Sequence, residues 1–256
     1  RTRSRRAFQQ ESCVNIAVFY SGVPRTNESF IRCNTSVKKH FPDADYYYAT
    51  WWSKAHLIPP NLDCLLLKEP HIHYHPLVDV PIENLQFKQR SLRERCLKDP
   101  EYRERTQHHT KQILGHAQQL KSIEKHYDLI VRVRYDTYLS HKVDLTKYVR
   151  ESVKQNIAIG FGTRTSRHRN LFELYELPKV QPKGFADNQD WYKYLMDPMI
   201  MHPPAKFNQE LCQELHDTKL LQVAENGWYQ VLSEDDDHLC VYGGAQIEKY
   251  LGTTIL

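Results

Sequence analysis

Residues 127–140 have the sequence YDLIVRVRYDTYLS, and this stretch decides the fold. Its apolar residues alternate with Arg132 and Arg134, and a period of two is typical of a β-strand. The run is mostly apolar, so we predict a strand in the core of the protein that ends at Asp136. In open α/β sheets, ligands bind beyond the carboxyl ends of the strands. The sequence therefore predicts Asp136 at the ligand-binding edge of a sheet.

The two arginines and the aspartate admit two interpretations. Arg132 and Arg134 are two residues apart, so they lie on the same side of the strand. They are either ion-pair partners of buried carboxylates or ligands of a phosphate, which arginine binds with its planar fork. The carboxylate of Asp136 is a hard ligand that suits Mg²⁺ or Mn²⁺, and such an ion would bind a diphosphate.

The residues before this strand predict a βαβ unit. An apolar run at 14–20 ends in the turn SGVPR. A helix at 27–41, with Asn27 as its N-cap, and a β-rich run at 44–52 follow. Such a unit favours a parallel sheet with crossover helices.

The rest of the chain fits the same class of fold. We expect a single α/β domain with a mostly parallel sheet flanked by helices. The further predicted elements are helices at 84–126, interrupted at Pro100, at 207–220 and at 224–236, and strands within 156–163, at 198–202 and near the end of the chain.

Two loops are candidates for contact with a phosphate. The turn after the first strand would lie at the same edge as Asp136, where Ser21 and Gly22 would approach a ligand and Arg25 would reach its phosphate. Arg164 lies in the basic loop GTRTSRHR, which is either a solvated loop or a second phosphate contact.

Acidic residues near the end of the chain are candidates for catalysis. Glu225 lies just ahead of a predicted helix, where a carboxylate either caps the helix or acts as a general base. Asp187 and Asp190 lie beside Trp191, a mixture of acids and an aromatic residue that suits contact with carbohydrate hydroxyls.

The composition limits the classes of protein to which the chain could belong. The 256 residues carry 35 basic and 31 acidic side chains, and much of the excess lies in RTRSRR at the start, within a predicted disordered arm at 1–12. That balance gives no strong nucleic-acid signal. No CxxC pair, signal peptide or apolar run of membrane length occurs, so we expect a cytoplasmic protein with no transmembrane segment, or a domain cut from a longer protein.

The segments IAVFYSGVPRT, DYYYATWW and YDLIVRVRYDTYLS, in this order, resemble the GT-A-type glycosyltransferase-like proteins of bacterial polysaccharide loci and large DNA viruses. The resemblance implies a Rossmann-like, nucleotide-binding part at about 13–165 and an acceptor-binding part at about 166–256. It also implies a hexosyl- or pentosyltransferase that moves a sugar from a nucleotide-sugar donor to a hydroxyl of a glycan or glycoprotein. The setting would be a bacterial or virus-infected host cell, in polysaccharide biosynthesis.

The resemblance also assigns roles to residues. The family's Asp-x-Asp motif ends in an aspartate that ligates Mn²⁺ or Mg²⁺, and Asp136 matches it, but Arg134 replaces the first aspartate. Glu225 matches the general base, and His238 matches a late metal ligand. Because of Arg134, a non-catalytic glycan-binding or virion-associated module of the same fold stays open as the alternative. The donor, the acceptor and the choice between inversion and retention stay open too.

Overall fold

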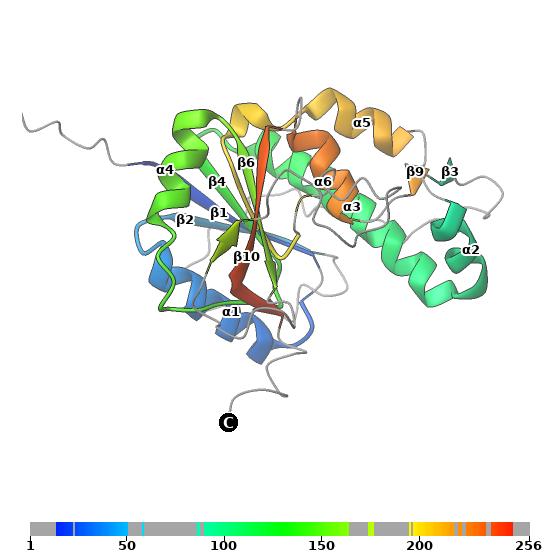
Figure 1. Cartoon of the computed structure of the whole chain (residues 1–256), viewed down its shortest axis with the longest axis horizontal. Helices are drawn as coiled ribbons and strands as arrows, with labels where there is room; N and C mark the ends of the chain where they lie inside the picture. Colours follow the sequence, from blue (N-terminus) through cyan, green and yellow to red (C-terminus); the bar gives the residue numbers. More distant parts are fainter. Residues whose placement is uncertain are drawn as a thin grey trace, which may run out of the picture.

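A computed structural model describes residues 14–22, 24–50, 58, 86–87, 90–163, 174–176, 195, 197–217, 220–221, 224–233 and 237–247 of the chain. These residues form three layers, with a mixed β-sheet between two layers of helices (Figure 1). This confirms the predicted α/β fold with helices on both sides of a sheet.

The large sheet has the strand order β2-β1-β4-β8-β6-β10-β5, and β7 pairs with β10. Strands β1, β2, β4, β6 and β10 run in one direction, whereas β8, β5 and β7 run in the opposite one. Most of the described strands are therefore parallel in direction, as predicted. The bounds are β1 Ile16–Ser21, β2 Asp45–Ala49, β4 Leu129–Val133, β5 Thr137–Leu139, β6 Ala158–Thr163, β7 Tyr175–Glu176, β8 Met199–His202 and β10 His238–Ile247.

The stretch at 127–140 forms two strands, where the sequence predicted one. Strand β4 lies between β1 and β8 inside the sheet, and the chain turns at Tyr135 and Asp136. Strand β5 then pairs antiparallel with the last residues of β10, at 245–247. The turn at Asp136 therefore lies at the carboxyl end of β4, as predicted.

Helices α1 (Asn27–His40) and α4 (Thr146–Gln155) cover one face of the sheet. Helices α3 (Pro100–Ser122), α5 (Gln209–Asp217) and α6 (Ala224–Leu232) cover the other (Figure 1). Helix α2 (Arg90–Lys98) packs on α3. A second small sheet pairs β3 (Gln86–Phe87) with β9 (Leu220–Leu221), and a 3₁₀ turn spans Pro204–Lys206.

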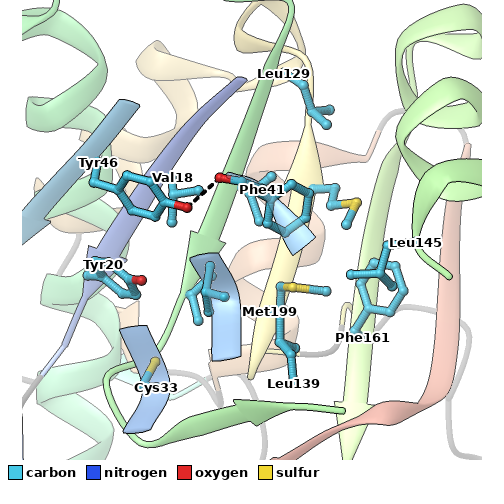
Figure 2. Close-up of a cluster of buried hydrophobic side chains, with 14 of the residues drawn as sticks. Val18, Tyr20, Cys33, Phe41, Tyr46, Leu129, Leu139, Leu145, Phe161 and Met199 are labelled. Carbon is cyan, nitrogen blue, oxygen red and sulfur yellow. Dashed lines mark hydrogen bonds between the residues drawn. The ribbon is translucent and has the colours of Figure 1, made fainter. Parts of the chain in front are cut away.

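The alternation of side chains along the strands produces two cores. On the α1 side, Val131 and Val133 of β4 join Tyr20, Phe30 and other residues in one buried cluster. Figure 2 shows part of this cluster, with the hydroxyl of Tyr46 donating to the backbone oxygen of Phe41. The alternate residues of β4 face α3 and α6, so Arg132 lies on the side of the second cluster.

The local signals for helix ends were largely correct. Helix α1 begins at Asn27, but its N-cap is Thr26, whose hydroxyl accepts from the Ser29 amide at 3.0 Å, so the predicted cap was wrong by one residue. Pro100 separates α2 from α3 as predicted, with Asp99 capping α3. Among the described helices, none has the length and apolar character that crossing a membrane requires.

Candidate functional site

The carboxyl end of β4 brings together charged residues from three separate segments. Asp136 follows β4, Arg25 comes from the loop after β1, and Asp197 lies just before β8. Because β8 runs antiparallel to β4, its start lies at the edge where β4 ends. The sequence predicted the meeting of Asp136 and Arg25 at this edge, and the structure confirms it with a distance of 3.1 Å between Oδ2 and Nε.

The carboxylate of Asp136 is held by two arginines. Its Oδ1 accepts from Arg134 Nε at 3.0 Å, and its Oδ2 accepts from Arg134 Nη2 at 2.9 Å and from Arg25 Nε. The paired bonds from Arg134 have the fork geometry that makes arginine–carboxylate pairs strong. Asp136 is only 4% exposed, so water does not replace these donors.

Arg134 also contacts a second carboxylate. Its Nη1 lies 3.3 Å from Asp197 Oδ2. Burial alone would lower the pKa of the Arg134 guanidinium, but the carboxylates of Asp197 and Asp136 raise the pKa above its ordinary value. The guanidinium therefore stays charged at every pH at which the protein would work, and 22% of the side chain remains exposed.

Arg132 lies beneath this cluster and is fully buried. Its Nε donates to Ser21 Oγ at 2.8 Å, its Nη2 donates to Gln112 Oε1 at 2.9 Å, and its Nη1 donates to the backbone oxygen of Asp197. Its guanidinium also lies over the ring of Trp228, 4.9 Å from the centroid. Of the two interpretations, ion pairing with a buried carboxylate therefore describes Arg132, whose Nη1 is 3.6 Å from Asp197 Oδ1.

Ser21 is the last residue of β1, and Gly22 begins the loop after it. Both are buried, and Ser21 faces Arg132, so neither is at the surface. Gly22 has a φ of 119°, a conformation that side chains with a Cβ rarely adopt. A Cβ there would lie 3.4 Å from the Gln112 side chain, an ordinary contact distance. The backbone conformation, not the space, is what requires glycine.

The structure does not bring His238 to this edge. His238 is the first residue of β10 and pairs with Ala158, the first residue of β6. Both strands run in the same direction as β4, so His238 lies at the amino end of the sheet, opposite Asp136. There it hydrogen-bonds with Ser233 at 3.0 Å. His238 and Asp136 cannot share a metal ion in this arrangement.

The described residues at this edge do not fit a divalent cation. In the described ranges, no group of three or more His, Cys, Asp or Glu side chains converges on a common point. Both oxygens of Asp136 are already bonded to arginines. A divalent cation would also be repelled by these guanidinium groups. At roughly 4 Å and an effective dielectric constant of 20, one guanidinium repels a unit positive charge by about 4 kcal/mol, and it repels a divalent ion by twice as much.

Of the remaining predicted site residues, the structure describes only the position of Glu225 along a helix. Glu225 is the second residue of α6, the helix that carries Trp228 above Arg132. Since α6 ends next to Ser233, the partner of His238 at the amino edge, its first turn is directed toward the edge of Asp136. Asp187, Asp190 and Arg164 lie outside the described residues.

Sequence reasoning missed two residues of the cluster. Asp197 is as central as Asp136, because it contacts both Arg132 and Arg134. Gln112 of α3 is buried against Arg132. An acid just before an apolar run could have indicated Asp197, had the run been recognised as an antiparallel strand. Nothing in the helical pattern of α3 distinguishes Gln112 from a surface residue.

Comparisons with known proteins give only structural likenesses. No protein-family model matches the sequence, and no curated protein matches it. The solved structure of a galactosyltransferase, LgtC, in complex with donor and acceptor sugar analogues, is similar over 89% of this chain and 72% of that one, with 13% identity and a TM-score of 0.40.

Two structures of residues 1–349 of S. aureus TarS are similar at 10% identity. One has a TM-score of 0.39 over 90% of this chain, and the other, in complex with UDP-GlcNAc, has 0.40 over 95%. The match spans only 60% and 62% of those two chains. At these values the likenesses carry no argument about the activity of this protein.

Proposed function

We propose that this protein is a glycosyltransferase that moves a sugar from a nucleotide-sugar donor to a hydroxyl of a glycan or glycoprotein. The observation that carries the proposal is the meeting of Arg25, Arg134 and Asp136 at the carboxyl edge of the sheet. Ligands of open α/β sheets bind at this edge. Arginine is the residue best suited to bind phosphate, and the order of segments along the chain resembles GT-A-type enzymes.

The proposed chemistry uses the arginines to stabilise the leaving group. As the bond between the sugar and the diphosphate breaks, negative charge grows on the diphosphate, and fixed guanidinium groups lower the barrier. Asp136 would act by positioning Arg134 and Arg25. In an inverting reaction Glu225, Asp187 or Asp190 would accept the proton of the acceptor hydroxyl. A retaining reaction would need no such base.

A second candidate function is a non-catalytic glycan-binding or virion-associated module. The specific observation that favours it is Arg134, which stands where the related motif has an acid. The two candidates differ in turnover. The enzyme releases a nucleoside diphosphate from its donor when an acceptor is added, whereas the module binds glycan and releases none.

The experiment combines calorimetric titration of the protein with a panel of nucleotide sugars and a coupled assay for released nucleoside diphosphate. We expect one donor to bind and to be turned over, and Asp136→Asn to lower kcat/KM at least about tenfold, a barrier change of roughly 1.4 kcal/mol. The amide would present an N–H group to a guanidinium N–H, so one arginine would lose its position.

Glu94→Gln is the matched control, because Glu94 also accepts from an arginine, Arg90 Nε at 3.0 Å, but lies on the exposed surface of α2. Its kcat/KM should equal that of the wild type. The proposal fails if no nucleotide sugar binds, with or without Mn²⁺. Binding of glycan without any release of nucleoside diphosphate would favour the second candidate.

A further inference from the structure

The acids at the carboxyl edge are already neutralised by arginines. Asp136 accepts three hydrogen bonds, and all three come from the guanidinium groups of Arg134 and Arg25. A metal ion at Asp136 would have to share a carboxylate that already accepts these three bonds, and it would lie close to two guanidinium groups. Asp197 likewise faces the guanidinium groups of Arg132 and Arg134.

The formal charge of the described cluster favours an anion. Three guanidinium groups, of Arg25, Arg132 and Arg134, face two carboxylates, of Asp136 and Asp197. Counted over the ion pairs of these five side chains, guanidinium groups outnumber carboxylates, which attracts an anion and repels a cation.

The arginines also keep donors that these carboxylates do not use. Arg134 directs its Nε, Nη1 and Nη2 toward carboxylates, and each of its η nitrogens carries a second hydrogen. Among the described residues, Arg25 binds Asp136 through Nε, and both of its η nitrogens remain for a ligand. The Arg25 side chain is 52% exposed, so a ligand reaches these donors from solvent.

From these contacts we infer that Arg25 and Arg134 form a site for the diphosphate of the donor that works without a bridging divalent cation. The inference rests on the proposed function and departs from the metal dependence that the resemblance implies. Asp136 and Asp197 orient the guanidinium groups, and the unused N–H groups bind the phosphate oxygens directly. Arg132, being fully buried, holds Asp197 and takes no part in binding.

The test is calorimetric titration of the full chain with inorganic pyrophosphate, UDP and GDP, each in EDTA and again in Mn²⁺. We expect pyrophosphate and at least one nucleotide to bind in EDTA with an affinity within about threefold of that in Mn²⁺, a difference of under roughly 1 kcal/mol. Arg25→Gln should weaken binding in EDTA about tenfold, because a hydrogen bond to a charged group contributes that much.

Two further variants keep the result interpretable. Arg90→Gln changes an arginine of α2 that is 92% exposed, and it should leave the affinity for pyrophosphate unchanged. Arg134→Lys keeps the charge between the two aspartates but removes the fork, so it should weaken binding without unfolding the protein.

The other outcomes separate the inference from the proposed function. Binding that requires Mn²⁺ overturns the inference and leaves the function intact. Binding in EDTA that survives both Arg25→Gln and Arg134→Lys overturns the assignment to these residues. If neither a phosphate compound nor a nucleotide sugar binds under either condition, both proposals fall.

Discussion

Arg132→Met is the perturbation that most directly tests the architecture beneath the site. Methionine fills part of the volume of the side chain but donates no hydrogen bond. Its introduction leaves Ser21 Oγ, Gln112 Oε1 and the backbone oxygen of Asp197 without their donor. It also removes a guanidinium group that faces the Asp197 carboxylate.

The expected loss follows from these contacts. Removing one partner of a buried ion pair costs about 3–5 kcal/mol. Arg134 still lies 3.3 Å from Asp197, so that carboxylate is not left without compensation. We therefore expect the lower end of the range, about 3 kcal/mol, which is a large fraction of the roughly 5–15 kcal/mol that stabilises a domain.

Urea unfolding, followed by circular dichroism and analysed by linear extrapolation, measures the loss. The matched control is Arg90→Met, because Arg90 pairs with Glu94 on the surface and an exposed pair contributes under about 1 kcal/mol. If Arg132→Met also costs less than about 1 kcal/mol, then water or neighbouring groups satisfy these acceptors, and Arg132 does not hold the site together.

Two more predictions concern buried positions. Gly22→Ala should lower the free energy of unfolding by about 1–3 kcal/mol, because alanine is strained at a φ of 119°, and equal melting temperatures for the variant and wild type would refute this. His116 and His202 are fully buried, and their Nε2 atoms lie 2.9 Å apart. Burial lowers the pKa of His202 to about 4 and lowers the pKa of His116 well below its ordinary value. Below about pH 6.5 the unfolded chain binds protons on these two histidines, whereas the folded chain does not. The free energy of unfolding is therefore unaffected by them above that pH, and it falls toward pH 4 by about 1.4 kcal/mol per pH unit for each histidine. Urea unfolding should show this slope between pH 7 and about pH 5, where carboxylates are still ionised. The exposed control His126→Gln should show the same slope as the wild type, and a flat profile would contradict the prediction.

Local signals in the sequence predicted the elements whose partners are close along the chain. The apolar run of β1, the turn after it and the spacing of Phe30, Cys33 and Val37 sufficed to predict the first βαβ unit. The break between β4 and β5 was missed because β5 pairs with the end of β10, over a hundred residues later. The pattern of alternating residues continues through that turn, so periodicity could not reveal it.

The candidate site was likewise predicted only in part, where a local signal in the sequence sufficed. Asp136 and Arg25 were predicted from the rule that ligands meet the carboxyl ends of strands, and the two residues are in contact. His238 was misplaced because its order in the chain was compared with a family pattern, whereas it begins β10, which runs parallel to β6 and so starts at the opposite edge. Asp197 was missed for the converse reason, since the start of an antiparallel strand lies at the ligand edge.

The charge at position 134 reconciles the departure from the motif of the resembling family with the proposed diphosphate site. An aspartate together with a bound divalent cation carries one net positive charge, and a single arginine carries the same charge. Arg134 can therefore present the same formal charge to a diphosphate while its carboxylate neighbours, Asp136 and Asp197, fix its position. Arginine also supplies donors in a fixed geometry, whereas a metal ion must be recruited from solution. On this argument the substitution changes how the positive charge is delivered and does not remove it, so loss of the acid is compatible with a working transferase.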